Sequence, residues 1–300
     1  MTDDLPTLYV DTLERALTHT LYEPVDVDVQ GRRSMRRLKN LLRRRGIVAM
    51  FGSPVDAANR DEGRDWPIFA HTMMGCRRMS NLRFCVERAL EEDVPGDLIE
   101  AGVWRGGAGI LMRGVLCARG VTDRDVWVAD SFAGLPPPDV NAHPADSGAD
   151  WHEWSQLVVT RSEVEANYRR YGLLDDRVHF LEGWFSETLP IVAERCWAVV
   201  RLDGDMYGST MDSLKNLYPG LSTGGYIIVD DYFALPACRQ AVDDYRAEHG
   251  ITEPIQRIDW TGAYWRNEGT TMRNMPITST AATRTDDATQ DGGTQAEFDR

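Results

Sequence analysis

The sequence predicts an α/β fold in which helices cover both faces of a mostly parallel central sheet. Short apolar runs, typical of buried strands, lie at residues 97–103, 126–132, 177–183, 197–203 and 226–232. Stretches with helical spacing separate them, near residues 107–119, 161–172, 208–218 and 236–248. Strands that alternate with helices build βαβ units, so a Rossmann-like arrangement is expected.

The segment before the first strand is expected to add helices to this core. Residues 8–22 carry apolar side chains at helical spacing, and residues 71–90 show the same period with Gly75 near their start. Residues 31–45 hold a dense basic run. This run is either a solvated helix face or an arm that contacts an acidic partner or another subunit. Residues 53–66 are predicted to be a polar loop.

The end of the chain is expected to complete the fold and then lose regular structure. The short segments PIQRID and GAYWRN are predicted to form an edge hairpin. From about residue 277 the sequence is rich in Thr, Asp, Gly and Gln, which is typical of a disordered tail. We therefore divide the chain into an N-terminal helical or lid segment (1–70), a main domain (71–268) and a disordered tail (277–300).

A long insertion follows the second predicted strand. Residues 133–160 contain four prolines and two tryptophans. Long loops inside a compact domain are usually functional. In open α/β sheets, ligands bind at the carboxyl ends of the strands, which is where this insertion begins. We therefore expect it to border a binding site.

Composition limits the class of partner. The net charge of −14 disfavours nucleic acid as a substrate, because a negative surface repels phosphates. No apolar run approaches the roughly 18 residues that a membrane span needs. The first residues lack the pattern of a signal peptide, and the five cysteines form no CxxC pair. We expect a cytoplasmic protein with free cysteines.

Glycines follow the first predicted strand, as in a cofactor-binding turn. Gly102, Gly106 and Gly107 give the spacing G-x-x-x-G-G, which differs from the G-x-G-x-x-G of dinucleotide-binding proteins. Glu100 stands two positions before the first glycine, where its carboxylate would repel a pyrophosphate. A ligand with cationic groups and no phosphate fits better. S-adenosylmethionine (SAM), with its ammonium and sulfonium groups, is such a ligand.

The next two strand ends carry groups suited to the rest of that ligand. Asp130 and Ser131 end the second strand, where a carboxylate can accept hydrogen bonds from ribose hydroxyls. Glu182, Gly183 and Trp184 end the third, where the indole can face an adenine ring and Glu182 its exocyclic amine. Alternatively, Asp130 caps a helix and Trp184 lies in the core. The ordered set on three successive strands favours SAM binding.

Acidic residues end the fourth and fifth predicted strands, at Asp203 and Asp205 and at Asp230 and Asp231. Carboxylates that converge on one sheet edge repel one another unless a cation lies between them. Oxygen ligands without His or Cys indicate Mg²⁺, with Ca²⁺ or Mn²⁺ as lesser options. Asp230 and Asp231 share one ion only if the chain turns there, so one of them alternatively caps the next helix. Asp205 ranks last as a ligand, because it can cap the helix near Ser209.

This constellation suggests methyl transfer to oxygen. A divalent ion lowers the pKa of a bound hydroxyl and orients it, and a neighbouring carboxylate can take its proton. Transfer is then an in-line displacement at the carbon next to the sulfonium. A vicinal diol or a catechol, which can chelate the ion through both oxygens, is the natural acceptor.

The quoted motifs together resemble the macrocin O-methyltransferase family, which includes mycinamicin and novobiocin sugar O-methyltransferases. The resemblance rests on LIEAGVWRGGAGILMRG, VWVADSFAGLPPPD, RLDGDMYGSTMDSL and GGYIIVDDYFALPACRQAV, and it covers roughly residues 8–268. It implies the class I SAM-dependent methyltransferase form of the predicted fold. It also implies a Mg²⁺-dependent enzyme that methylates a deoxysugar hydroxyl of an antibiotic or similar natural product, and a homodimer or higher homo-oligomer.

The resemblance also implies roles for individual residues. Asp203, Asp230 and Asp231 correspond to the metal ligands, and Asp203 to the general base. Thr72 and Met73 correspond to a segment that lies against the methionine portion of SAM. The acceptor contacts in the 133–160 insertion vary within the family and are not implied. Its two histidines, His143 and His152, are interpreted as solvated loop residues.

Three other classes compete with this interpretation. A catechol or phenol O-methyltransferase would use the same metal chemistry, but the N-terminal segment and the VWVADSFAGLP motif favour the sugar enzymes. An NAD-dependent oxidoreductase is disfavoured by Glu100 and the missing glycine motif. A non-catalytic SAM-binding protein would not need the acidic residues at the fourth and fifth strand ends.

Overall fold

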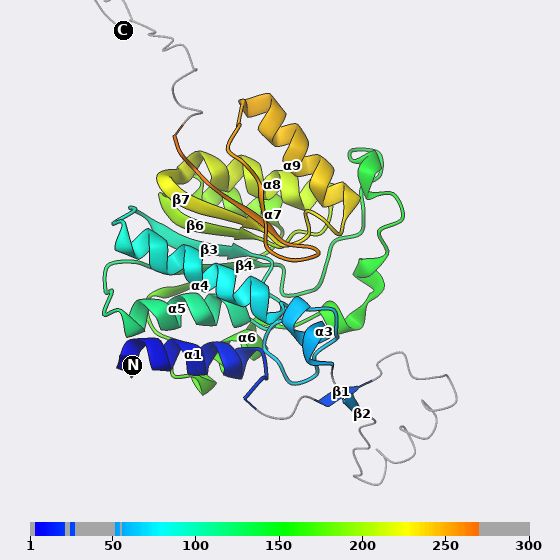
Figure 1. Ribbon diagram of the computed structural model, residues 1–300. Coiled ribbons are helices and arrows are strands. Elements are labelled where there is room, and N and C mark those ends of the chain that lie inside the picture. Colours follow the sequence, from blue (N-terminus) through cyan, green and yellow to red (C-terminus); the bar gives the residue numbers. More distant parts are fainter. Residues whose placement is uncertain (1–3, 22–24, 28–51, 55, 270–300) are drawn as a thin grey trace, which may run out of the picture.

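A mixed sheet of seven strands runs through the centre of the computed structural model, which describes residues 4–21, 25–27, 52–54 and 56–269 (Figure 1). The strand order is β5-β4-β3-β6-β7-β9-β8. β3 to β7 pair in parallel, whereas β9 runs antiparallel to β7 and β8 antiparallel to β9. The bounds are β3 Asp97–Ala101, β4 Val126–Asp130, β5 Val178–Glu182, β6 Trp197–Leu202, β7 Leu221–Val229, β8 Gln256–Arg257 and β9 Ala263–Arg266.

The predicted α/β class and the C-terminal edge hairpin are confirmed. All five apolar runs form strands, and β7 begins at Leu221, five residues before the predicted start at Tyr226. Because β3 lies between β4 and β6, the chain builds the sheet outward in two directions from β3. This reversal creates a crevice at the carboxyl ends of β3 and β6, the usual ligand site of open α/β sheets.

Helices cover both faces of the sheet and bury two apolar layers (Figure 1). Leu98 and Val128 of the sheet share one layer with α1, α4, α5 and α6. Ile99 and Val200 share the other with α8 and α9. The helices are α1 Leu5–Leu17, α4 Cys76–Glu91, α5 Gly107–Ala118, α6 Arg161–Arg170, α7 Phe185–Thr188, α8 Tyr207–Leu217 and α9 Pro236–His249.

The N-terminal segment is tied to the main domain. α1 packs on α4 and α5 and buries Val10, Leu13 and Leu17. Two short strands, β1 Val25–Val27 and β2 Gly52–Pro54, pair antiparallel. The division of the chain at residue 70 stays a prediction, and the basic run and the tail beyond 277 lie outside the described residues.

The prediction of an unbroken loop over residues 53–66 was wrong. This segment contains the last residues of β2 and the helix α3, Ala57–Glu62. The Asp56 carboxylate accepts a hydrogen bond from the Ala58 amide at 2.9 Å, and Gly63 ends the helix with φ of 65°. Capping residues at both ends therefore stabilise a helix too short and polar to show a helical apolar pattern.

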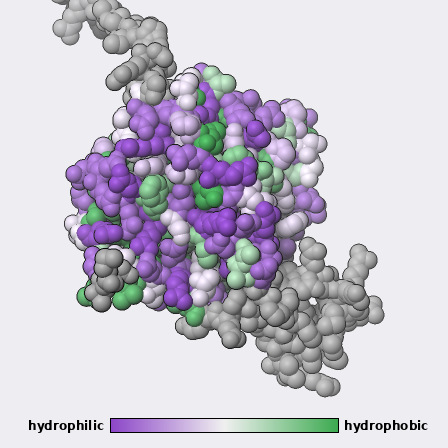
Figure 2. Space-filling model, viewed as in Figure 1, coloured by the Kyte–Doolittle hydropathy of each residue, from purple (hydrophilic) through white to green (hydrophobic). Residues whose placement is uncertain are grey.

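The surface agrees with the composition. Figure 2 shows that hydrophilic residues dominate the visible face, with small, separate apolar areas between them. In the described part of the chain, no helix is long and apolar enough to cross a membrane. The five cysteines are all free, as expected.

Candidate active site

A cavity of about 660 Å³ opens at the carboxyl ends of the central strands. Its walls include the ends of β3, β4, β6 and β7, residues 72–74 before α4 and parts of the 133–160 insertion. Of the predicted site residues, Thr72, Met73, Glu100, Gly102, Asp130, Ser131, Gly183, Trp184, Asp203, Asp230 and Asp231 line it. Gly106 and Glu182 do not.

The glycine turn joins β3 to α5 directly beside β6. Gly102 has φ of 89°, and a Cβ there would lie 2.0 Å from the Asp203 carbonyl oxygen. Only glycine fits this approach. Gly106, with φ of 86°, precedes α5, and a Cβ on it would contact Val164 of α6 at 2.7 Å. Gly106 therefore allows the turn to pack closely against α6 and does not form the cavity wall.

Glu100 is buried between α5 and β6. Its carboxylate accepts a hydrogen bond from the Gly109 amide at 2.9 Å and forms an ion pair with Arg201 at 2.7 Å. Burial raises the pKa of Glu100 to about 8, although Arg201 opposes the shift. The carboxylate borders the cavity with its charge already balanced by an arginine, which sequence reasoning did not foresee.

Asp130 organises the loops around the end of β4. Its two oxygens accept hydrogen bonds from the amides of Val103 and Phe132, each at 2.8 Å. Burial raises the pKa of Asp130. The helix-cap alternative is excluded, because the insertion and not a helix follows β4. Asp130 and Ser131 both line the cavity.

The end of β5 contributes less than predicted. Gly183 and Trp184 line the cavity, and the Trp184 side chain is exposed, so it is not a core residue. Glu182 points elsewhere: it is exposed and pairs with Arg161 at 3.3 Å. On the opposite wall, Thr72 is buried and its hydroxyl accepts a hydrogen bond from the Met74 amide at 3.0 Å.

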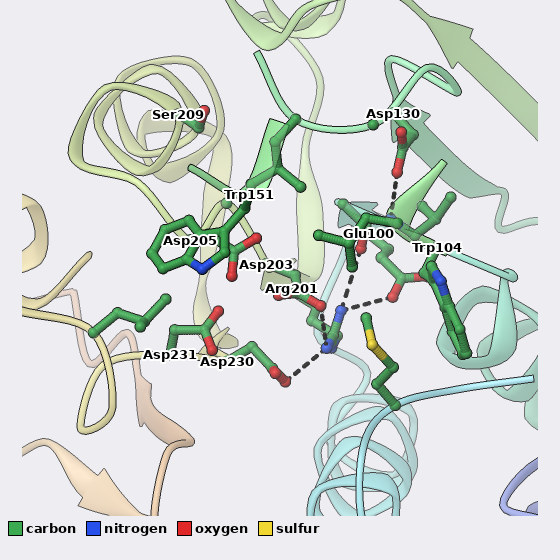
Figure 3. Close-up of a pocket in the computed structure, with 18 of the residues that line it drawn as sticks. Glu100, Trp104, Asp130, Trp151, Arg201, Asp203, Asp205, Ser209, Asp230 and Asp231 are labelled. Carbon is green, nitrogen blue, oxygen red and sulfur yellow. Dashed lines mark hydrogen bonds and ion pairs between the residues drawn. The ribbon is translucent and has the colours of Figure 1, made fainter. Parts of the chain in front are cut away.

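Three carboxylates meet at the ends of β6 and β7. Oxygen atoms of Asp203, Asp205 and Asp231 all lie within 4.8 Å of one another, and we call these residues the acidic cluster (Figure 3). Burial and the charge of Asp203 raise the pKa of Asp205 to about 8. Burial and the charges of Asp205 and Asp203 raise the pKa of Asp231 well above its usual range. Oδ2 of Asp231 is buried and accepts no hydrogen bond within the described residues. A cation between these carboxyl groups would relieve the repulsion that raises their pKa values, and the free oxygen of Asp231 offers it a ligand.

Asp205 belongs to the acidic cluster, although the sequence analysis ranked it last as a ligand. It does not cap α8, because the amides of Tyr207 and Gly208 donate to Asp146 of the insertion, at 2.6 and 3.1 Å. Asp231 does not cap α9 either, since no side chain caps that helix. β7 ends at Val229, and the chain turns at Asp230 and Asp231, so both side chains reach the cavity.

Asp230 is held by two buried arginines. It pairs with Arg201 at 2.6 Å and with Arg78, which also binds Asp259 at 3.0 Å. Burial alone would raise the pKa of Asp230, but Arg78 and Arg201 outweigh it and keep the pKa below its usual value. Asp230 is therefore not a member of the acidic cluster, although the sequence ranked it above Asp205.

Arg201 links the two halves of the cavity. Besides Glu100 and Asp230, it pairs with Asp203 at 2.9 Å, so one guanidinium joins the ends of β3, β6 and β7 (Figure 3). Sequence reasoning missed this residue. The available signal was a lone arginine inside the apolar run WAVVRLD, two positions before Asp203.

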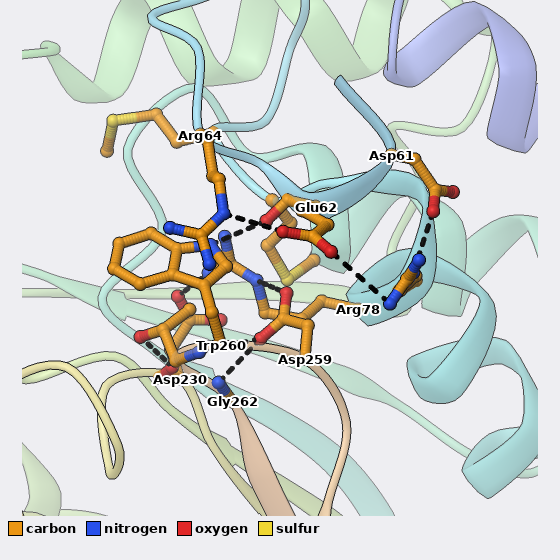
Figure 4. A network of polar contacts seen from close by, with 12 residues as sticks. Asp61, Glu62, Arg64, Arg78, Asp230, Asp259, Trp260 and Gly262 are labelled. Carbon is orange, nitrogen blue, oxygen red and sulfur yellow. Dashed lines mark hydrogen bonds and ion pairs between the residues drawn. The ribbon is translucent and has the colours of Figure 1, made fainter. Parts of the chain in front are cut away.

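A second polar network fastens α3 beside the cavity (Figure 4). The Trp260 indole donates to the Glu62 carbonyl at 2.8 Å, and the Arg64 guanidinium lies 4.5 Å from the Trp260 ring centre. Asp259 accepts hydrogen bonds from the amides of Thr261 and Gly262 while it binds Arg78. The N-terminal segment and the β8–β9 turn are thus joined at one wall.

Comparison with known proteins supports the resemblance noted above. The sequence profile described as Macrocin-O-methyltransferase (TylF) matches residues 6–267. The 8-demethyl-8-(2,3-dimethoxy-alpha-L-rhamnosyl)-tetracenomycin-C 4'-O-methyltransferase of Streptomyces olivaceus is 47% identical over 276 residues, which cover 92% of this chain and 98% of that protein. The demethyldecarbamoylnovobiocin O-methyltransferase of Streptomyces niveus is 53% identical over 208 residues, covering 69% and 79%. The structure of the O-methyltransferase NovP superposes with a TM-score of 0.77 at 45% identity, covering 87% of this chain and 99% of that one.

Proposed function

This chain belongs to the macrocin O-methyltransferase family and is a SAM-dependent O-methyltransferase, and from that premise we propose that it methylates a sugar hydroxyl of a glycosylated natural product in antibiotic biosynthesis. The observation that carries this proposal is the acidic cluster beside a cavity that also holds the predicted donor residues. The two Streptomyces relatives named above are O-methyltransferases whose names specify natural products, and one name specifies a rhamnosyl group.

The donor half of the cavity lies along β3, β4 and β5. We assign the ribose hydroxyls to Asp130, the adenine face to Trp184 and the methionine portion to Thr72 and Met73. Glu100 contributes through Arg201 and the Gly109 amide, because both of its oxygens are engaged. Glu182 leaves the proposed set, since it pairs with Arg161 at the surface.

The acceptor half lies at β6 and β7 and is proposed to hold Mg²⁺. Asp203 and Asp231 belong both to the predicted ligand set and to the acidic cluster. We keep Asp230 as the third ligand, because a carboxylate oxygen that accepts from an arginine retains a further lone pair. Arg78 and Arg201 would then be the outer-shell partners that orient it, as ligating carboxylates usually have.

A bound divalent cation supplies Lewis acidity that lowers the pKa of an acceptor hydroxyl. The residues of the chain do the rest. Asp203 takes the proton of that hydroxyl, since it ends β6 directly against the glycine turn of the donor half. Arg201 keeps Asp203 oriented through their 2.9 Å ion pair. Leu135 and Leu157 of the insertion add apolar surface to the walls of the same cavity.

Location and assembly belong to the same proposal. We propose a cytoplasmic homo-oligomer, most simply a dimer. Leu5, Leu8 and Tyr9 on α1 are exposed at helical spacing and offer an apolar face for a second copy.

The test is methyl transfer from labelled SAM to a panel of demethylated glycosides and to their free aglycones, with Mg²⁺ and with EDTA. Label should enter at least one glycoside, should require the metal and should be absent from every aglycone. Transfer to a catechol or phenol aglycone without its sugar would instead assign the chain to the phenol enzymes. Full activity of metal-free protein in EDTA would remove the metal from the scheme.

A further inference from the structure

The 133–160 insertion is fixed to the domain at two places. The first is Asp146, which is 3% exposed and whose carboxylate binds the amides of Tyr207 and Gly208 at the start of α8. The short turn that contains it, η1 Pro144–Asp146, packs against both α8 and α9. His143 is a partly exposed loop residue that also lies against Tyr207, with ring centres 5.4 Å apart.

The second anchor is a group of three tryptophans. Trp154 of the insertion lies 6.4 Å from Trp66, and Trp66 lies 6.5 Å from Trp104, measured between ring centres. The Trp104 indole donates to the Gln156 carbonyl at 3.1 Å. This anchor joins the insertion to the segment after α3 and to the glycine turn. The residues between Asp146 and Trp154 are thus held at both ends.

Trp151 lies between the two anchors, in the turn η2 Trp151–Glu153, and it lines the cavity. In Figure 3 it points into the cavity on the side of Asp203 and Asp205. Its side chain is partly exposed. Among the described residues it has no aromatic partner, unlike Trp66 and Trp104, and its indole N–H donates no hydrogen bond, unlike that of Trp104. A rigid turn therefore presents an aromatic face that the protein itself does not use.

The surroundings of Trp151 select the kind of ring that would stack on this face. Ser209 and Asp212 of α8 line the same cavity, and the Asp212 carboxylate has no ion pair or hydrogen bond within the described chain. A pyranose has an apolar C–H face and a rim of hydroxyls. The C–H face suits the electron-rich face of an indole, and the rim suits Ser209, Asp212 and the acidic cluster.

We propose that Trp151 is the platform on which the pyranose ring of the acceptor stacks, and that it determines the preference for glycosylated acceptors. This inference rests on the proposed function and adds a specificity residue to it. Trp151 supplies binding and orientation for the ring, whereas the acidic cluster addresses the reacting hydroxyl.

The test compares Trp151→Ala, Trp151→Phe and the matched control His152→Ala. His152 is the next residue of the same turn, is exposed and does not line the cavity. With a glycoside that the wild type methylates, Trp151→Ala should raise the acceptor KM by about tenfold, the order expected for a lost aromatic contact. The KM for SAM should not change. Trp151→Phe should recover much of the loss, and His152→Ala should match the wild type.

A binding measurement without turnover completes the test. Methyl α-L-rhamnopyranoside is mixed with enzyme loaded with Mg²⁺ and S-adenosylhomocysteine, and saturation transfer from protein to ligand is recorded by NMR. Transfer should reach the C–H protons of one ring face in the wild type and in His152→Ala, and should be lost in Trp151→Ala. An unchanged acceptor KM in Trp151→Ala overturns this inference while the proposed function stands. Equal saturation transfer in Trp151→Ala and the wild type overturns it as well, whereas methylation of free aglycones alone overturns both.

Discussion

Arg201 is the residue whose removal the structure predicts to be most informative. Arg201→Met keeps the length of the side chain and deletes a charge that pairs with Glu100, Asp203 and Asp230. Removing one partner of a buried ion pair typically costs about 3–5 kcal/mol of unfolding free energy, because the other charge is left uncompensated.

In Arg201→Met, the contacts that remain should keep the loss of unfolding free energy at the lower end of this range. Asp230 keeps its pair with Arg78. The pKa of Glu100 is about 8 even with Arg201 present, so this carboxyl can take a proton at neutral pH. Asp203 alone is left as an unpaired charge. We therefore expect a loss of about 3 kcal/mol, which for a domain of this size lowers the Tm by at least about 6 °C.

Urea unfolding at pH 7 in EDTA measures this loss, with Arg177→Met as the matched control. Arg177 pairs with Asp125 at 3.1 Å on the surface, and such pairs contribute at most about 1 kcal/mol. Addition of Mg²⁺ should restore part of the stability of Arg201→Met, since the cation neutralises Asp203. Equal losses in the two variants would refute the view that Arg201 balances the charges of the site.

Three further predictions concern the site and a fourth concerns the assembly. Asp203→Asn should reduce kcat by about 10²–10⁴, the range for a lost general base, with the SAM affinity nearly unchanged. Asp205→Asn should reduce kcat by a smaller factor. If steady-state kinetics show the larger loss in Asp205→Asn, Asp205 and not Asp203 is the base. Asp130→Ala should weaken SAM binding by about 1–3 kcal/mol in calorimetry, and unchanged affinity would contradict the ribose assignment. The pKa values of Glu100 and Asp205 are raised to about 8, mainly by burial, so the folded protein retains protons that the unfolded chain releases near pH 4. The stability of the metal-free protein should therefore fall from about pH 5 to pH 8, and a rise of the urea midpoint over that range would oppose the assignment. Light scattering should report a dimer at micromolar concentration, and a monomer would exclude the proposed assembly.

Strand ends were predictable because buried parallel strands are short apolar runs and their carboxyl ends meet at one edge. The sequence therefore predicts that Asp130, Asp203 and Asp231 lie at one edge, and all three line the same cavity. Helix α3 was missed because its stability comes from capping by Asp56 and Gly63 and not from an apolar period.

Contacts between distant segments account for the other differences. Nothing near Asp146 in the sequence indicates that its carboxylate caps α8, 61 residues away. The engagement of Asp230 by Arg78 depends on how α4 packs across the sheet, at a separation of 152 residues. Only a folded chain reveals which carboxylates have arginine partners and which form the acidic cluster.

The close approach of Gly102 to Asp203 affects how precisely the methyl donor and the acceptor are aligned. The backbone of the donor turn and the backbone that carries the proposed base are in van der Waals contact, with no side chain between them. The distance between the methyl donor and the acceptor oxygen is thus set largely by main-chain geometry and only to a small extent by side-chain rotamers. Displacement reactions lose about a hundredfold in rate for an error of about 1 Å. Any residue larger than glycine at position 102 would act as a spacer in this alignment, slowing transfer even in a protein that still binds both ligands.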